Sequence, residues 1–345
     1  MWLLFVTSCS NQTLDDAGIR GDESGSREVT VIETAYQPNL PRGLPPYHVP
    51  PNNPMTTEKV ELGRRLFFDP QLSVDGSMSC ATCHDPEKGW SNGLPVAVGV
   101  HGEAGNRNVP SILNAAYYRA QFWDGRAGSL EGQALGPITN PIEMAMPSLQ
   151  ELVTRLNQDE SYPSQFAAAF ADGLTATNVA KAIASYERTI IAANSPYDRY
   201  MAGEKDAMSA AAVRGMELFF DKRKTKCSIC HEAPAFTAMF YHNIGVGMDK
   251  ESPDWGRYEV TKIESNKGKF KVPTVRDLKY TAPYMHDGSI ATLEEVVELY
   301  DKGGIPNPYL SDEMRSGKLN LSPQEKKDLV TFMVEGLTSD EIPSR

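Results

Sequence analysis

Two short motifs constrain this 345-residue chain more than any other feature of its sequence. Both have the pattern C-x-x-C-H, the first at Cys80–His84 and the second 147 residues later at Cys227–His231. In this pattern the two thiols can form thioether bonds to haem vinyl groups, and the histidine can ligate the iron. Paired cysteines also occur in zinc knuckles and redox dithiols. A histidine follows both pairs, and the motifs use four of the five cysteines, so the sequence favours two covalent c-type haems bound through Cys80, Cys83, His84, Cys227, Cys230 and His231.

An internal repeat precedes the two motifs. Residues 61–69 read E-L-G-R-R-L-F-F-D, and residues 214–221 read R-G-M-E-L-F-F-D. Each half therefore reads as a helix that ends in Phe-Phe-Asp, then a loop, then a haem-attachment turn. The repeat predicts a mainly α protein with two cytochrome c-like domains, each with one covalently bound c-type haem. The expected boundaries are residues 1–54 for an N-terminal segment, 55–205 for the first haem domain and 206–345 for the second.

Apolar spacing and capping residues predict further helices along the chain. Residues 10–54 are polar and then rich in proline, which is typical of a tether or an extended surface arm. A helix is expected to begin at Thr56 or Thr57, and a polar connection is expected over 197–205. A short extended piece is expected over 269–273. The other predicted helices are Leu149–Leu156, Tyr162–Phe170, Thr177–Ile191, Thr292–Tyr300 and Ser322–Leu337.

The charge balance limits the classes of partner. The chain has 34 Lys and Arg residues against 45 Asp and Glu residues, a formal charge of -11. Nucleic acid is therefore not an expected partner, whereas a basic electron-donor protein would be attracted to such a surface. A solvated acidic surface without that partner explains the charge equally well.

The N-terminus carries a candidate lipid anchor. No stretch approaches the roughly 20 apolar residues that span a bilayer, and Met1–Cys9 lacks a basic start. Val6–Cys9 resembles a bacterial lipobox, whose cysteine is acylated. The prediction is an anchor at Cys9 with the true start codon upstream, and the alternative is a spare thiol. Covalent c-haem attachment implies assembly outside the cytoplasm, so we expect a periplasmic protein, lipid-anchored at Cys9.

The segments 121–127 and 136–144 resemble the bacterial dihaem cytochrome c peroxidase family, which also contains MauG-type enzymes. The resemblance covers the chain from about residue 61 to residue 337. In that family a Trp, a Gln and a Glu spaced ten residues apart serve the peroxide-binding haem, and Trp123, Gln133 and Glu143 keep this spacing. The resemblance implies that Glu143 moves a proton, Gln133 holds the peroxide and Trp123 relays electrons. Taken singly, Trp123 could be a core residue, Gln133 a residue on a helix surface and Glu143 a residue next to a helix N-cap.

The same resemblance assigns the iron ligands that lie far from the motifs. His101 corresponds to a distal histidine that blocks the first haem until the second is reduced; the alternative is a surface-loop histidine. Many peroxidases have a Met at the position of Tyr300. MauG-like members have a Tyr there, as this chain does. A phenolate favours ferric iron and a thioether favours ferrous iron. Met285 and Met314 are alternative ligands, and Tyr300 would then only complete a helix face.

A calcium ion between the domains is also implied, held by Asn108 and the main-chain carbonyls of Thr281 and Pro283. The expected function is reduction of hydrogen peroxide to water at the first haem, with electrons from a small periplasmic donor, a cytochrome c or a cupredoxin. One alternative is a MauG-like enzyme that oxidises Tyr or Trp residues of a partner protein. Another is a dihaem electron-transfer cytochrome without chemistry of its own. A homodimer is an assembly that the sequence allows.

Overall fold

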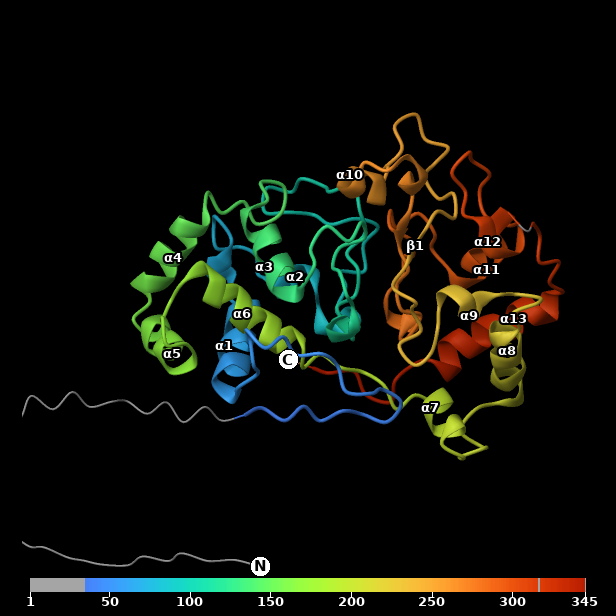
Figure 1. Ribbon diagram of the computed structural model, residues 1–345, viewed down its shortest axis with the longest axis horizontal. Helices are drawn as coiled ribbons and strands as arrows, with labels where there is room; N and C mark the ends of the chain where they lie inside the picture. The colour runs from blue at the N-terminus through green and yellow to red at the C-terminus, as the bar shows by residue number, and fades with distance from the viewer. Residues whose placement is uncertain (1–34, 316, 345) are drawn as a thin grey trace, which may run out of the picture. The chain divides into compact units, whose positions relative to one another are not determined.

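The computed structural model describes residues 35–315 and 317–344, so the predicted anchor Cys9 lies outside the described residues. The described chain is mainly helical, as the motifs and periodicity predicted. One group of helices precedes residue 190 and appears at the left of Figure 1. It consists of α1 (Thr57–Phe67), α2 (Cys80–Cys83), α3 (Leu130–Thr139), α4 (Leu149–Gln158), α5 (Ser161–Ala169) and α6 (Ala176–Glu187).

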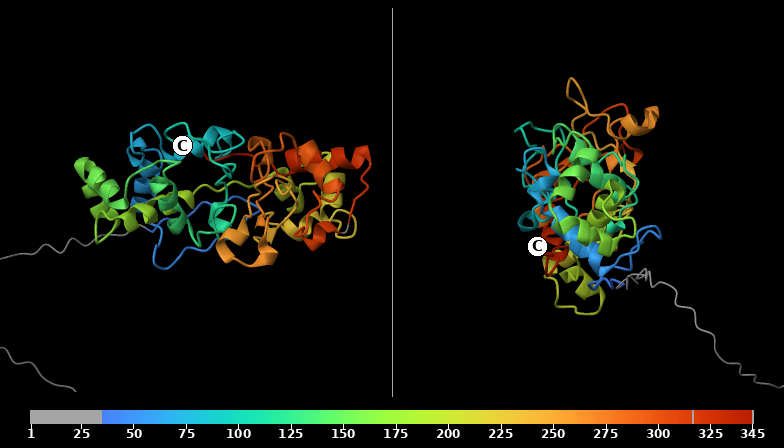
Figure 2. Two further views of the ribbon diagram at one scale, coloured as in Figure 1. Left: turned by 90° about the horizontal axis from the view of Figure 1, so that it is seen from above. Right: turned by 90° about the vertical axis from the view of Figure 1, so that its left-hand side faces the viewer.

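The remaining helices and a short sheet follow. Strands β1 (Tyr241–His242) and β2 (Phe270–Lys271) pair antiparallel, with Tyr241 opposite Lys271. The left view of Figure 2 keeps the two helical groups apart, as Figure 1 does. The second group consists of α7 (Pro196–Met201), α8 (Ala210–Phe220), α9 (Cys227–Cys230), α10 (Arg257–Thr261), α11 (Leu293–Asp301), α12 (Asp312–Arg315), α13 (Pro323–Thr331) and the π-helical turn η6 (Phe332–Gly336).

The sequence repeat corresponds to a repeated helix packing. Helix α1 packs against α6, and a Cβ atom on Gly63 would lie 1.9 Å from the carbonyl oxygen of Ala182. Helix α8 packs against α13, and a Cβ atom on Gly215 would lie 1.9 Å from the carbonyl oxygen of Asp328. Each glycine lies four residues before the first phenylalanine of its Phe-Phe pair. Both halves therefore use a glycine to bring two helix backbones together.

Each group of helices encloses its own aromatic core. In the first half, Phe67 contacts Trp90 and Tyr186, and all three are buried. In the second half, Phe219 contacts both Phe236 and Phe332. The last residues return to the first half, where the indole Nε1 of Trp90 donates to the carbonyl oxygen of Pro343 at 2.9 Å.

Three predicted segments differ from the observed ones. Helix α6 ends at Glu187 rather than near 191, because the side chain of Asn114 hydrogen-bonds the backbone N–H and C=O of Ala192 and holds that stretch extended. The predicted polar connection over 197–205 contains α7, which Ser195 caps. The last helix continues past Thr331 as η6, not as a regular α-helix.

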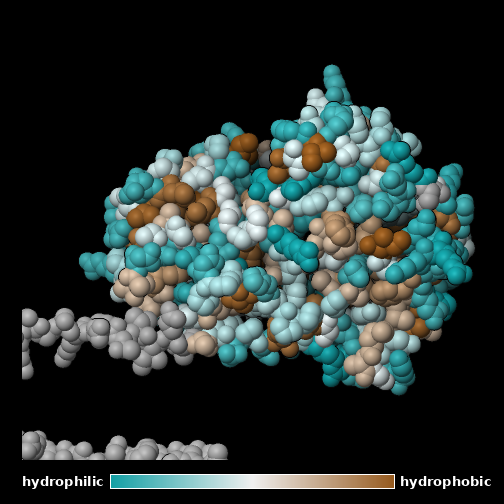
Figure 3. Space-filling model, viewed as in Figure 1, coloured by the Kyte–Doolittle hydropathy of each residue, from teal (hydrophilic) through white to brown (hydrophobic). Residues whose placement is uncertain are grey.

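Residues 35–54 form the extended arm that their composition predicted. The backbone N–H of Tyr36 donates to Met55, and Leu44 is buried against Ile191 and Ala193. The face in Figure 3 is mostly hydrophilic, with hydrophobic side chains in scattered groups. None of the described helices combines the length and the apolar character that a bilayer span requires.

Candidate functional site

The first C-x-x-C-H motif forms one helical turn followed by its histidine. Helix α2 spans the two cysteines, and His84 follows as the residue after the helix. The Nδ1 atom of His84 lies 3.1 Å from the carbonyl oxygen of Trp90. Burial disfavours the charged imidazolium and lowers the pKa of His84 to about 4. A neutral ring that donates from Nδ1 leaves Nε2 free to ligate a metal.

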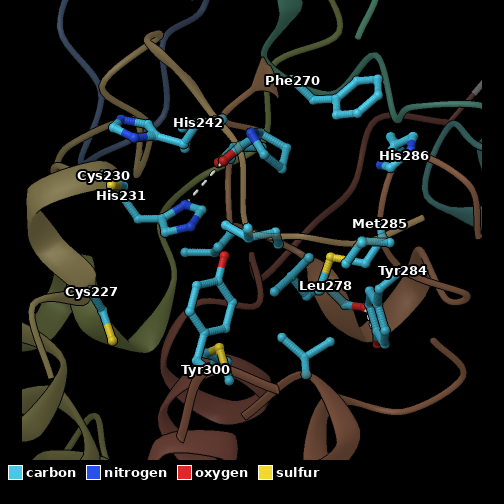
Figure 4. A pocket seen from close by; sticks show the side chains of 18 of the residues that line it. Cys227, Cys230, His231, His242, Phe270, Leu278, Tyr284, Met285, His286 and Tyr300 are labelled. Atoms are coloured by element: carbon cyan, nitrogen blue, oxygen red, sulfur yellow. Dashed lines mark hydrogen bonds between the residues drawn. The ribbon is translucent and has the colours of Figure 1, made fainter. Parts of the chain in front are cut away.

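The second motif reproduces this geometry with different partners. Helix α9 spans Cys227–Cys230, and the Nδ1 atom of His231 lies 3.1 Å from the carbonyl oxygen of Pro273. Figure 4 shows this hydrogen bond as a dashed line. Burial lowers the pKa of His231 to about 4 as well. Both histidines are therefore neutral and oriented by backbone carbonyls, which is the form that binds iron.

The surroundings of the cysteine thiols fit thioether attachment. Burial raises the pKa of Cys83, Cys227 and Cys230 to about 11 each, and it also raises the pKa of Cys80. Reactive redox dithiols and thiolate metal ligands need the opposite, an electropositive site that lowers the thiol pKa. Apolar surroundings beside a neutral histidine suit the edge of a haem.

A cavity of about 260 Å³ adjoins the second motif. Cys227, Cys230 and His231 line one side, and the hydroxyl of Tyr300 points into the same space (Figure 4). Most of the other lining is apolar, which suits a flat macrocycle with apolar faces. The residues present around the cavity thus fit a haem held by this motif.

Tyr300 lies in α11, which forms close to the predicted range 292–300, with Thr292 as its N-cap. Burial raises the pKa of its phenol, and the nearby thiols of Cys230 and Cys227 add to this effect. Met285 and Met314 also line the cavity. The structure therefore brings all three candidate ligands to one space, and Tyr300 as the ligand stays a prediction.

Glu143 lies in the loop after α3, with its carboxylate Oε1 accepting from Nδ2 of Asn140 at 2.8 Å. Burial raises the pKa of Glu143, while the Asn140 hydrogen bond and the charge of Arg126 oppose the rise. The charge of Glu143 in turn contributes to the raised pKa of the Cys83 thiol. The carboxyl group is therefore close to the first haem motif. Sequence analysis missed Asn140, although its place three residues before Glu143 was a readable signal.

Trp123 and Gln133 have different surroundings. The indole Nε1 of Trp123 donates to the carbonyl oxygen of Asn108 at 2.9 Å, and its own carbonyl accepts from the backbone N–H of Lys271 at 2.7 Å. Trp123 also lines the cavity of the second motif, so it connects the two halves. Gln133 is half-buried on α3, and within residues 35–315 and 317–344 its side chain makes no hydrogen bond to Glu143.

His101 lies at the exposed tip of a hairpin in which Val98 pairs with Ala104. The hairpin is joined to the site, because the backbone N–H of Val100 donates to the carbonyl oxygen of Glu143 at 2.8 Å. Hydrogen bonds from Ser77 lower the pKa of Asp75, which is also exposed, and His101 adds a smaller contribution. His101 faces outward in this structure, and its role as a gate stays a prediction.

Backbone carbonyls converge on the side chain of Asn108. Its Nδ2 lies 3.0 Å from the carbonyl oxygen of Leu94, 3.3 Å from that of Pro95 and 3.4 Å from that of Pro283. The opposite amide orientation would place Oδ1 among these three oxygens and create an oxygen cluster of the kind that calcium prefers. The carbonyl oxygen of Thr281 is not part of this set of hydrogen bonds. Calcium at Asn108 and Pro283 stays a prediction.

A buried acid beside the first motif was not found from the sequence. Glu187 is 4% exposed, and its Oε2 has no hydrogen-bond partner among the described residues. Burial raises its pKa to about 8, with neighbouring Arg188 opposing the rise and Glu131 adding to it. Glu187 therefore holds a proton at neutral pH in the folded chain, whereas an exposed glutamate does not.

This acid predicts a pH dependence of stability. Between about pH 4.5 and 8 the folded state binds a proton at Glu187 that the unfolded state has lost, so the free energy of unfolding should fall as pH rises. Urea unfolding at pH 5 and pH 8 should show a loss of a few kcal/mol in the wild type. Glu187→Gln should remove most of that loss, and the exposed control Glu151→Gln should keep it. Equal losses in the wild type and Glu187→Gln would contradict this account.

Comparison with known proteins places the chain among dihaem proteins. Residues 57–206 match the family model described as di-haem cytochrome c peroxidase. The chain is 40% identical to the methylamine utilization protein MauG of Methylorubrum extorquens, over 95% of this chain and 89% of that protein. It is 36% identical to the cytochrome c551 peroxidase of Nitrosomonas europaea, over 76% of this chain and 78% of that protein.

The solved structures agree with the sequence comparisons. A MauG-like protein associated with microbial copper homeostasis has a TM-score of 0.79 and 34% identity, covering 89% of this chain and 96% of that one. The diheme peroxidase BthA from Burkholderia thailandensis has a TM-score of 0.69 at 22% identity, covering 87% of this chain and 95% of that one. At 22% identity, the similarity to BthA shows a shared fold only.

Proposed function

Because the chain belongs to the dihaem cytochrome c peroxidase family, which includes MauG proteins, we propose that it reduces hydrogen peroxide to water with electrons from a small donor protein. Each peroxide takes up two electrons and two protons and yields two water molecules. The haem iron at His84 supplies, when bound, the centre at which the O–O bond breaks. The observation that carries this proposal is the half-buried carboxyl of Glu143 next to the first motif.

Glu143 is the proposed acid–base group. Peroxide cleavage requires a proton to move from the inner to the outer oxygen, and one carboxyl group can accept it and return it. Its raised pKa brings the group nearer to the working pH, where both protonation states are accessible. The Asn140 side chain holds the carboxylate in place. Gln133 is proposed to hold the peroxide through its amide, which can both donate and accept.

Trp123 is the proposed electron relay between the halves. Its carbonyl oxygen accepts from the backbone N–H of Lys271, and its indole Nε1 donates to the carbonyl oxygen of Asn108. Trp123 also lines the cavity of the second motif. His231 is the proposed ligand of the second haem, which would pass electrons from the donor to the first. His101 is proposed to gate the first haem by moving with its hairpin, since the hairpin already touches the Glu143 segment.

A MauG-like activity, oxidation of Tyr or Trp residues in a partner protein, is the second candidate. The observation that favours it is the Tyr300 hydroxyl pointing into the second cavity (Figure 4). An anionic oxygen ligand would stabilise oxidised iron and thereby favour storage of oxidising equivalents. The electron-transfer cytochrome without chemistry of its own gains no support from a half-buried carboxyl beside the first motif.

The remaining proposals concern surroundings and partners. We propose a periplasmic protein, lipid-anchored through Cys9, with a calcium ion at Asn108. The formal charge of -11 favours a basic donor, a cytochrome c or a cupredoxin, over nucleic acid. A homodimer is the proposed assembly to be tested by light scattering.

Peroxide titration of the diferric protein and its Tyr300 variants separates the two candidates. The wild type should change its haem spectrum after one equivalent of peroxide. Tyr300→Met should raise the potential of the second haem, since a neutral soft donor replaces an anionic oxygen, and a tenfold change in the equilibrium corresponds to about 59 mV. Donor-dependent turnover should then persist, while a long-lived oxidised state should shorten.

The companion variant Tyr300→Phe removes only the hydroxyl. It should alter the spectrum and the potential of the second haem. An unchanged spectrum and potential would remove Tyr300 from the iron and direct the search to Met285 or Met314. A wild type whose spectrum does not respond to peroxide would contradict both enzymatic proposals.

A further inference from the structure

A buried lysine borders the second cavity without an acidic partner. Lys271 in β2 is 8% exposed, and its Nζ lies 3.6 Å from the centroid of the Tyr118 ring. None of the ion pairs or side-chain hydrogen bonds found among residues 35–315 and 317–344 involves this ammonium group. Burial alone lowers the pKa of Lys271 to about 7. A lysine amine is rarely buried in this way unless something neutralises its charge.

Three other basic side chains that line the cavity are either paired with a carboxylate or neutral. Arg276 binds both carboxylate oxygens of Asp198, at 2.7 and 2.8 Å. His242 pairs with Glu313 at 3.3 Å, and His286 stacks on Phe270 with a ring distance of 3.6 Å. Burial lowers the pKa of His286 to about 4, so this ring is neutral.

Lys226 also lines the cavity, but it directly precedes Cys227 and therefore lies at the attachment turn. Among the described lining residues, Lys271 is thus the buried cation that is available to a ligand away from that turn.

A haem carries two propionate carboxylates, which are groups that a lysine ammonium can bind. The thioether bonds form on the vinyl edge of the macrocycle, and the two propionates extend from the other edge. Cys227 and Cys230 would fix the vinyl edge at α9. Phe270, the neighbour of Lys271 in β2, lies across the cavity from Cys227 (Figure 4). The backbone N–H of Lys271 donates to the carbonyl oxygen of Trp123, where the first half of the chain meets the cavity.

We propose that the ammonium group of Lys271 binds a propionate carboxylate of the second haem and so positions this haem against the Trp123 segment. The ion pair would neutralise two groups that are each costly to bury alone. It also places a fixed positive charge near the iron, which disfavours the ferric state relative to the ferrous state. The proposal rests on the proposed haem at His231, but it does not depend on peroxide turnover.

The experiment compares Lys271→Met, Lys271→Arg and the control Lys279→Met in the full-length dihaem protein. Lys279 is an exposed lysine of the same half, so its loss changes the net charge equally. Haem content is counted first, and the potentials of both haems are then titrated at pH 5.5 and pH 8. Peroxide turnover is not used as a readout, so a failed turnover assay leaves this result independent.

Lys271→Met should shift the ferric–ferrous equilibrium of the second haem about tenfold towards the ferric form at pH 8, which corresponds to about 59 mV. The shift should be smaller at pH 5.5, where an unpaired buried propionate takes up a proton and loses its charge. The first haem should be unchanged. Lys271→Arg and Lys279→Met should both match the wild type at the two pH values.

Equal potentials in Lys271→Met and the wild type at both pH values would overturn the proposal. If Lys271→Met fails to load the second haem, Lys271→Arg decides: loading with the wild-type potential supports the ion pair, and failure of both overturns it. Tyr118→Leu tests the competing role, in which the lysine only packs on the ring. A shift in that variant as large as in Lys271→Met would also overturn the proposal.

Discussion

Glu143→Gln is expected to keep both haems and the fold while peroxide turnover falls by about 10²–10⁴-fold. The amide has nearly the same shape and still hydrogen-bonds Asn140, but it cannot accept a proton and return it. Steady-state turnover with a reduced small donor measures the effect, and haem content with the circular dichroism spectrum checks the fold. Because the carboxyl acts in the chemical step, the loss should appear in kcat rather than in KM alone.

The control for this variant is Glu103→Gln. Glu103 is an exposed glutamate on the hairpin that carries His101, so its replacement changes the charge near the site without removing the proposed acid–base group. Glu103→Gln should keep its turnover within a small factor of the wild type. A loss of less than about threefold in Glu143→Gln would show that another group moves the proton, since acid–base groups contribute far more than this.

Removal of both cysteines of one motif is expected to reduce the covalent haem content from two to one. In Cys80→Ser with Cys83→Ser, no thiol remains on α2 for a thioether bond, and the same holds for α9 in Cys227→Ser with Cys230→Ser. Haem staining after denaturation, followed by identification of the haem-bearing peptides, measures the outcome. Each double variant should lose its own haem peptide and retain the other.

The two double variants should also differ in the activity that they retain. Loss of the first haem should abolish the reaction with peroxide, whereas loss of the second should leave a first haem that reacts but receives electrons poorly. Ile229→Val, a conservative change at an exposed position inside the second motif, should retain both haems. Two covalent haems in either double variant would rule out the proposed attachment sites.

Local chemistry in the sequence was sufficient for the cofactor motifs and for most of the helices. The C-x-x-C-H pattern works within one helical turn, so its geometry requires no distant residue. The helix starts at Thr56 and Thr292 follow from side-chain caps that act within three residues. The repeat was also readable, because Gly63 and Gly215 occupy the same place relative to Phe-Phe-Asp and make the same close contact.

Only the tertiary structure decided the features that depend on contacts between distant segments. Helix α6 stops at Glu187 because Asn114, some 70 residues earlier in the chain, binds the extended backbone beyond it. The carbonyl of Pro273 orients His231 across 42 positions, and His101 faces outward because its hairpin pairs with itself and with the Glu143 loop. The burial of Lys271 and Glu187 is likewise set by packing from several elements, so a lysine and a glutamate that look ordinary in the sequence become buried titratable groups beside the two haem motifs.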